Sequence, residues 1–178
     1  MYSSFENLPK IIKLIKDGKI GVIPTDTIYG IVGSALNKKT VEEIYRLKKR
    51  SKKKPFIILI SNLNDLKKFD INLTKDQTIF LKKLWPNPVS VVLQKVAFRM
   101  PKDKWLLELL KKVGPLVAPS ANFEGEKPAQ TLDEAKKYFG SKVAIYLDGG
   151  TIISSPSTLV KLNLDGSYKI LRKGNYRI

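Results

Sequence analysis

Apolar positions along the chain follow a helical period at first and then the short runs of strands. Between residues 8 and 15 they recur at helical spacing and stop before Gly18, which predicts an amphipathic helix ending at this glycine. Apolar runs at 20–23 and 28–32 flank the polar turn Thr25-Asp26-Thr27 and predict two strands. Further helices are predicted at 40–47, 62–69, 74–85, 105–113 and 132–139, and further strands at 56–60, 89–93, 97–100, 143–147, 158–162 and 168–171.

The order of these elements indicates an α/β chain. Helices alternate with strands early, whereas Asp165-Gly166 between two alternating runs predicts a late hairpin, so we expect a mixed sheet with packed helices. Thr40 and Glu43 predict a capping box at the start of the second helix. No repeat or linker divides the 178 residues, so a single domain over 1–178 is expected.

Hydropathy and the N-terminal pattern argue against membrane insertion and export. No apolar run approaches the roughly 20 residues that span a bilayer. Met1 to Lys19 lacks the charged start, apolar stretch and small-residue cleavage site of a secretory leader. We therefore expect a cytoplasmic protein that makes no membrane contact.

Composition narrows the chemistry. Cysteine and histidine are both absent, which excludes disulfides, thiolate zinc sites, cysteine nucleophiles, imidazole bases and Ser/His/Asp triads. The remaining Lys, Arg, Asp, Glu, hydroxyl and backbone groups favour the binding and chemistry of phosphates. The net charge of +17 reflects either a lysine-rich solvated surface or a face that binds nucleic acid, and both alternatives stay open.

A basic segment follows the second predicted helix. Every residue from Lys48 to Lys54 except Ser51 is cationic. If the chain runs extended toward Pro55, alternate side chains point the same way and form a phosphate cradle from Lys48, Arg50, Lys52 and Lys54. The alternative is a solvated charge run or a sequence that mimics a nuclear-localisation signal.

Two polar turns are candidates for ligand binding. Ser120-Ala121-Asn122 follows the apolar run Leu116 to Ala118, and its hydroxyl and amide can donate to an anion or a ligand carboxylate. Thr25-Asp26-Thr27 has the same potential. In both cases the side chains can instead bond their own backbone as structural turns. Neither familiar glycine-rich nucleotide loop, GxxxxGK[ST] or GxGxxG, is present.

Seven motifs in one order carry a resemblance to a known family, covering about residues 20–174. The chain resembles the YrdC/TsaC family of threonylcarbamoyl-AMP synthases. The motifs are Pro24-Thr25-Asp26-Thr27-Ile28-Tyr29-Gly30, Lys48-x-Arg50 with Lys54-Pro55, Trp85-Pro86-Asn87-Pro88-Val89-Ser90, Arg99-Met100-Pro101, Gly114-Pro115-Leu116-Val117-Ala118-Pro119-Ser120-Ala121-Asn122, Ser157-Thr158-Leu159-Val160 and Leu171-Arg172-Lys173-Gly174.

The resemblance implies a fold and an activity. The fold is a single YrdC-type α/β domain with a twisted sheet and a positively charged concave face. The activity is that of a nucleotidyltransferase that forms L-threonylcarbamoyladenylate and pyrophosphate from L-threonine, bicarbonate or CO₂, and ATP with Mg²⁺. A separate TsaD-type threonylcarbamoyl transferase complex then modifies adenosine in tRNA.

The resemblance also implies roles for particular residues. Lys48 and Arg50 are the catalytic pair on the ATP phosphates, and no residue is expected to bind a metal directly. We expect both of them on a solvated cleft wall. The ATP-binding set is Lys48, Arg50, Lys54, Asn122 and Arg172, and the threonine-binding set is Thr27, Arg99, Ser120 and Ser157, with Arg99 as the partner of the threonine carboxylate.

One departure from the family and two other functions remain to be weighed. Many family members carry a histidine in the strand at 56–60, which is wholly apolar here, so threonine recognition is expected to use fewer polar contacts. The main alternative is a non-catalytic module that binds tRNA or double-stranded RNA on the basic face. A lesser one is the carbamoyl-adenylate chemistry of hydrogenase-maturation relatives, whose additional domains this sequence lacks.

Overall fold

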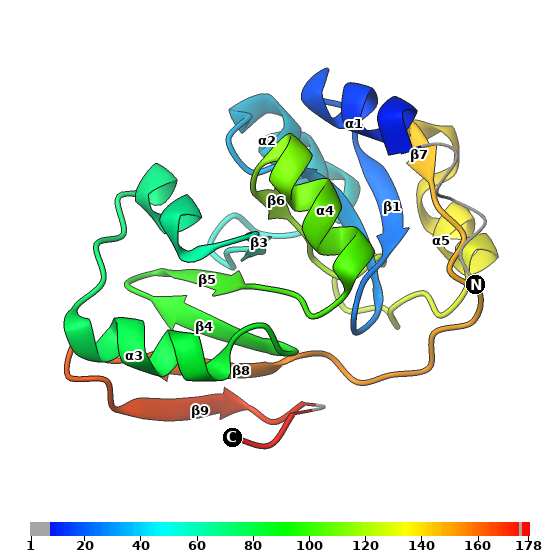
Figure 1. Ribbon diagram of the computed structural model, residues 1–178. Helices are drawn as coiled ribbons and strands as arrows, with labels where there is room; N and C mark the ends of the chain where they lie inside the picture. Colours follow the sequence, from blue (N-terminus) through cyan, green and yellow to red (C-terminus); the bar gives the residue numbers. More distant parts are fainter. Residues whose placement is uncertain (1–7, 175) are drawn as a thin grey trace.

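A mixed β-sheet organises the chain in the computed structural model, which describes residues 8–174 and 176–178 (Figure 1). Residues 1–7, which belong to the segment from Met1 to Lys19 that was checked for a secretory leader, lie outside the described residues. The strands are β1 (Gly21–Pro24), β2 (Tyr29–Ser34), β3 (Ile57–Leu59), β4 (Val89–Leu93), β5 (Val96–Arg99), β6 (Leu116–Val117), β7 (Ile145–Tyr146), β8 (Thr158–Leu162) and β9 (Tyr168–Arg172).

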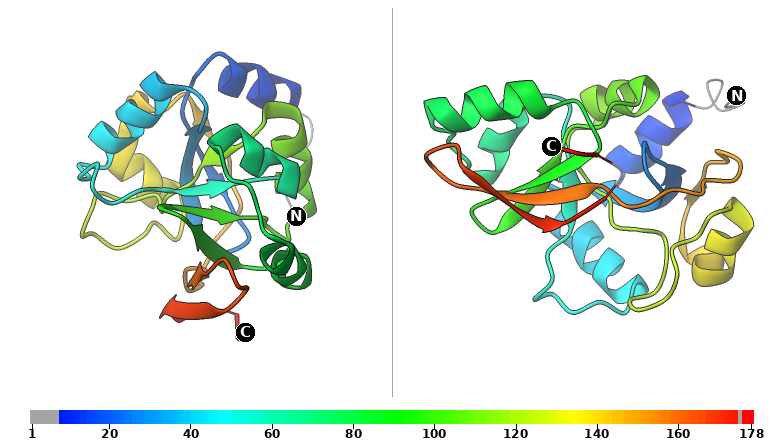
Figure 2. Two further views of the ribbon diagram at one scale, coloured as in Figure 1. Left: turned by 90° about the vertical axis from the view of Figure 1, so that its left-hand side faces the viewer. Right: turned by 90° about the horizontal axis from the view of Figure 1, so that it is seen from below.

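In the part of the chain that the structure describes, helices lie in four of the eight connections between these strands, and one helix precedes β1. The helices are α1 (Leu8–Lys16), α2 (Lys38–Leu47), α3 (Lys75–Leu84), α4 (Lys104–Val113) and α5 (Leu132–Phe139), together with 3₁₀ helices at Leu63–Phe69 and Gly140–Lys142. Figure 2 shows the sheet from two further directions, with helices packed on it. The helices and strands predicted from sequence are all present, with bounds shifted by at most two residues, although the helix at 63–69 is a 3₁₀ helix.

The nine-stranded sheet has the order β7-β1-β2-β6-β3-β5-β4-β8-β9. The pairs β3–β5, β4–β8 and β1–β7 are parallel, and the remaining pairs are antiparallel. The mixed α/β fold is therefore confirmed. The hairpin between β8 and β9 is also confirmed, with Gly166 at φ 81° in its turn.

Two hydrophobic cores lie on opposite faces of the sheet. The central strand β3 shows this most directly, because the consecutive residues Ile58 and Leu59 point to different cores, as alternation along a strand requires. The core on the Leu59 side contains Ile11 and Ile15 of α1 and Trp105, Leu106, Leu109 and Leu110 of α4. The core on the Ile58 side contains Ile44 and Leu47 of α2, Leu81 and Leu84 of α3, and Ala135 and Phe139 of α5.

The predicted start of α2 is wrong. The helix begins at Lys38 and its N-cap is Asn37, whose side chain accepts a hydrogen bond from the backbone N–H of Thr40 at 3.2 Å. The Thr40 hydroxyl donates instead to the carbonyl of Gly18 at 2.9 Å, and Glu43 pairs with Arg46 at 2.6 Å. Asn is as good an N-cap as Ser or Thr, so the earlier cap prevails.

The predicted extended cradle after α2 is also wrong. Lys48 keeps a nearly helical conformation at φ −78° and ψ −6°, Lys49 adopts φ 52°, and the N–H of Lys54 closes a turn onto the Ser51 carbonyl at 3.1 Å. The four basic side chains therefore do not share one face. Lys52, one of the four residues of the proposed cradle, instead pairs with Glu42 at 3.1 Å.

Among the described residues, no helix has the length and apolar character that a membrane crossing requires. The positive charge of the concave face stays a prediction.

Candidate active site

A cavity of about 100 Å³ gathers the residues that the sequence assigned to threonine. Thr27, Arg99, Ser120 and Ser157 all line it, although they come from positions far apart in the chain. Arg172, which the resemblance assigned to the nucleotide side, lines the same cavity. The structure thus brings the two predicted sets into contact.

Arg99 ends β5 and is the central charge of this cavity, with only 4% of its surface exposed. Its Nη1 donates to the Thr27 hydroxyl at 3.1 Å, and its Nη2 lies 3.1 Å from the Asp26 carboxylate. Its buried Nε has no hydrogen-bond partner among residues 8–174 and 176–178. Burial lowers the pKa of Arg99, Asp26 opposes that shift, and the nearby Arg172 adds to it. Two guanidinium groups and one carboxylate leave positive charge for an anionic ligand.

The Thr25-Asp26-Thr27 turn contains one residue with a structural role and two that face Arg99. The Thr25 hydroxyl accepts from the backbone N–H groups of Thr27 and Ile28 at 3.2 and 3.3 Å and donates to the Ile28 carbonyl at 2.7 Å, which makes it the structural residue. Asp26 and Thr27 face Arg99. Asp26 also accepts from the backbone N–H of Lys102 at 3.2 Å, which fixes the carboxylate beside the guanidinium.

The C-terminal part of the chain closes the cavity. The hydroxyls of Ser157 and Ser90 are 2.8 Å apart, and the Ser157 carbonyl accepts from Arg172 at 2.9 Å. Gly174 packs directly on this segment, because a side chain there would overlap the backbone of Ser157 and Thr158. Its N–H donates to the Thr158 hydroxyl at 3.1 Å. The glycine therefore holds the end of β9, and with it Arg172, against the cavity.

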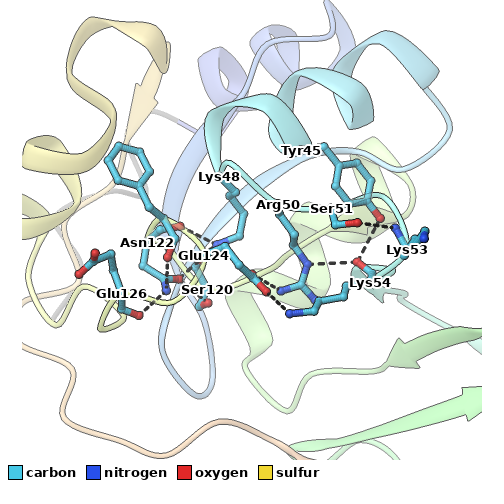
Figure 3. A network of polar contacts seen from close by, with 11 residues as sticks. Tyr45, Lys48, Arg50, Ser51, Lys53, Lys54, Ser120, Asn122, Glu124 and Glu126 are labelled. Carbon is cyan, nitrogen blue, oxygen red and sulfur yellow. Dashed lines mark hydrogen bonds and ion pairs between the residues drawn. The ribbon is translucent and has the colours of Figure 1, made fainter.

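Lys48 binds the second polar turn rather than solvent (Figure 3). The side chain is 1% exposed, so the expected solvated position is wrong for this residue. Its ammonium donates to the carbonyls of Ser120 and Asn122, at 2.5 and 2.7 Å, and to the Asn122 side-chain oxygen at 3.1 Å. Three acceptors match its three N–H groups, so the turn itself draws Lys48 inward.

Burial lowers the pKa of Lys48 from 10.5 to about 8, with Arg50 adding to this shift and Glu124 opposing it. Between these two pH values the unfolded chain holds more of the proton than the folded chain, so the stability contributed by this residue rises with pH. Relative to Lys48→Met, the unfolding free energy of the unsubstituted protein is expected to rise by about 3 kcal/mol over this window. Urea titrations of both proteins at several pH values measure this difference, and a flat difference would contradict the shift.

Beside Lys48, three charged side chains form the Glu124 bridge, defined as Arg50, Lys54 and Glu124. The two Glu124 oxygens lie 2.6 Å from Arg50 Nη1 and 2.9 Å from Lys54 Nζ. The Lys54 interaction, followed by that of Arg50, lowers the pKa of the Glu124 carboxyl. Figure 3 shows the carboxylate between the loop after Asn122 and the basic segment. Sequence reasoning assigned no role to Glu124, because its partners lie 70 and 74 residues away.

The cavity and the Glu124 bridge are joined by the Ser120–Asn122 turn. The Ser120 hydroxyl lines the cavity and donates to the Asn122 side-chain oxygen at 2.6 Å. The Asn122 amide donates to the carbonyls of Phe123 and Glu126 at 2.9 and 2.7 Å, which orders the loop that carries Glu124. One hydroxyl-lined anion cavity and one pair of cations therefore sit side by side. The described residues include no group of three or more His, Cys, Asp or Glu side chains placed to bind a metal.

Comparisons with known sequences give one consistent family. The model of the Sua5/YciO/YrdC family, described as "Telomere recombination", matches residues 13–174. A relative from Methanocaldococcus jannaschii is 31% identical over 179 residues, which cover 90% of this chain and 84% of that protein. The threonylcarbamoyl-AMP synthase of Pyrococcus abyssi is 30% identical over 164 residues, which cover 83% of this chain and 48% of that protein.

Solved structures agree with the sequence comparison. Pyrococcus abyssi Sua5 complexed with L-threonine matches with a TM-score of 0.85 at 28% identity, over 95% of this chain and 54% of that one. The chain therefore spans about half the length of that protein. Escherichia coli YciO matches with a TM-score of 0.81 at 18% identity, over 95% of this chain and 89% of that one, which shows the common fold.

Proposed function

The chain belongs to the Sua5/YciO/YrdC family, and on that premise we propose that it is a threonylcarbamoyl-AMP synthase. The observation that carries the proposal is the buried Arg99 in a cavity lined by hydroxyl groups, beside two further cations, Arg50 and Lys54. A homologous structure that binds L-threonine and relatives named for this activity support it.

L-Threonine is the proposed ligand of the cavity. Its carboxylate would pair with Arg99, whose Nε has no partner among the described groups, and with Arg172. Its hydroxyl and amine would use the oxygens of Thr27, Ser120 and Ser157, which line the same space. This set uses the charges and hydroxyls that the cavity already presents.

The proposed reaction has two steps. The threonine amine adds to CO₂ and releases a proton, which gives an N-carboxylate. One oxygen of this anion attacks the α-phosphorus of MgATP in line, the bond from that phosphorus to the bridging oxygen breaks, and pyrophosphate leaves. The attacking group is already an anion, so the second step needs no histidine base. Arg50 and Lys54 would neutralise the phosphates, while Lys48 would add its charge and hold the Ser120–Asn122 turn.

The product is a mixed anhydride, and a separate acyl transferase must consume it. We propose that a TsaD-type complex transfers the threonylcarbamoyl group to adenosine in tRNA, and that this takes place in the cytoplasm. The nucleotidyltransferase class follows from the transfer of the AMP moiety of ATP to the N-carboxylate.

Pyrophosphate release tests the proposal. With MgATP and bicarbonate, pyrophosphate release is expected to depend on L-threonine. Release should be weaker with L-serine, which lacks the methyl group of threonine, because a methyl group in a pocket contributes about 1 to 3 kcal/mol of binding free energy. Mass spectrometry should detect threonylcarbamoyladenylate. Release that is the same with and without threonine, from a folded protein that binds ATP, would contradict the proposal.

Added tRNA separates the synthase from the non-catalytic RNA-binding module. Turnover of the small substrates should proceed without RNA. An RNA module should instead bind tRNA with an affinity that falls steeply as salt rises. No contact among the described residues favours the RNA module over the synthase.

A further inference from the structure

We propose that Glu124 is an internal competitor of the ATP phosphates: its carboxylate occupies Arg50 and Lys54 in the free protein and must leave before the triphosphate binds. The inference rests on the proposed function, because it takes these two cations as part of the phosphate site. It adds a residue that controls how tightly the proposed enzyme binds its nucleotide.

The geometry of the Glu124 bridge is that of a bound anion. The two carboxylate oxygens divide between the two cations, at 2.6 Å from Arg50 and 2.9 Å from Lys54. A charged, planar group that spans a guanidinium and an ammonium fills the positions that two phosphate oxygens would take. Arg50 is further held by its Nε, which donates to the Lys54 carbonyl at 3.1 Å. The two cations therefore already face one anion together.

The backbone of Glu124 is anchored, whereas its side chain can rotate away. The backbone N–H of Glu124 donates to the Lys48 carbonyl at 2.8 Å, so the loop stays in place. The side chain is 28% exposed and borders solvent. The next residue, Gly125, adopts φ 89°, and its surroundings are open. Displacement of the carboxylate thus needs a change of rotamer and no rearrangement of the loop.

The energetic consequence follows from competition for the same cations. A triphosphate carries more charge than a carboxylate and outcompetes it at saturation. The apparent affinity of the triphosphate is the intrinsic affinity multiplied by the fraction of molecules in which Glu124 has left the two cations. Partly exposed ion pairs of this kind are weak, so the expected reduction is about fivefold. The opposite role, in which Glu124 preorders the cations for phosphate, predicts a change in the opposite direction.

The test compares Glu124→Gln with Glu42→Gln by calorimetric titration with inorganic tripolyphosphate and with MgATP. Glutamine keeps the shape of the side chain and removes its charge. Glu42 pairs with Lys52 at 3.1 Å in the same basic segment, so its substitution changes the net charge equally but leaves Arg50 and Lys54 untouched. Glu124→Gln is expected to bind both probes about fivefold more tightly, and Glu42→Gln to bind as the unsubstituted protein does. Unchanged or weaker binding by Glu124→Gln overturns the competitor role.

A third variant separates this inference from the proposed function. Arg50→Gln should lose most of its tripolyphosphate binding if Arg50 belongs to the phosphate site. Full binding by Arg50→Gln means that the phosphate site is misassigned, and the competitor role falls with it. Weaker binding by Arg50→Gln, together with unchanged binding by Glu124→Gln, overturns the competitor role alone.

Discussion

Replacement of Arg99 by methionine is expected to lower threonine-dependent pyrophosphate release by about a thousandfold, because the threonine carboxylate would lose its buried cationic partner. Arg99 is buried, lines the cavity and contacts Asp26 and Thr27, and its Nε has no hydrogen-bond partner in the described part of the chain. The loss should fall on the threonine KM and on kcat/KM, while the affinity for MgATP stays close to its original value. Steady-state kinetics with varied threonine and calorimetry with MgATP measure the two effects.

Two further variants keep this prediction testable if Arg99→Met fails to fold. Loss of Arg99 leaves the buried Asp26 carboxylate without its cationic partner. Removal of one partner of a buried ion pair lowers the unfolding free energy by about 3 to 5 kcal/mol. The double variant Asp26→Asn with Arg99→Met removes both charges and should recover much of that stability without recovering threonine use. Arg99→Lys keeps the charge but loses the planar guanidinium group with its several N–H donors, and it should raise the threonine KM. Near-normal threonine kinetics in a folded Arg99→Lys or double variant would contradict the assignment.

Replacement of Lys48 by methionine is expected to affect stability and activity together. The substitution removes a donor from the carbonyls of Ser120 and Asn122 and from the Asn122 side-chain oxygen. The Ser120 carbonyl keeps the Asn122 N–H and the Asn122 side-chain oxygen keeps the Ser120 hydroxyl, so among the described contacts the Asn122 carbonyl alone is left unsatisfied. An unsatisfied buried acceptor costs about 1 to 3 kcal/mol, so the expected loss is about 2 kcal/mol of unfolding free energy. Since the same turn joins the cavity to the cations, pyrophosphate release should fall by about a hundredfold. Urea unfolding and steady-state kinetics measure the two losses.

Lys53→Met is the matched control for this substitution. Lys53 lies in the same basic segment, is exposed, and makes its only described hydrogen bond through its backbone N–H. The substitution removes the same charge and should leave the unfolding free energy nearly unchanged. Equal stability of Lys48→Met and Lys53→Met would show that Lys48 does not hold the Ser120–Asn122 turn.

The fold could be predicted because its signals are local. Apolar periodicity located all the α-helices and every strand except the two-residue β6, and Asp165-Gly166 marked the hairpin between β8 and β9. Errors arose where two local signals competed. Asn37 and Thr40 are both good N-caps, and the distant carbonyl of Gly18 decides between them by accepting the Thr40 hydroxyl.

The candidate site could be predicted only as a set of residues. The motifs named Thr27, Arg99, Ser120 and Ser157, and the structure gathers them in one cavity. Their arrangement could not be predicted, because it depends on contacts between distant segments. The clearest case is Lys48, which was expected on a solvated cleft wall and is instead buried, because the turn at 120–122 supplies three acceptors for its ammonium group. Glu124 was missed for the same reason.

The place of Arg172 on the last strand has a consequence for how the protein acquires its function. Ser157 and Arg172 complete the cavity wall that Thr27 and Arg99 begin, and β8 must pair with β4 across a long stretch of chain to bring them there. Pairings between distant segments form late and slowly, because loop closure precedes any gain from the contacts. A nascent or C-terminally shortened chain would therefore hold the Asp26–Arg99 pair without a closed pocket. Binding of the proposed ligand, L-threonine, would therefore require the completed fold. Protection of the protein by threonine during refolding should appear only in the final phase.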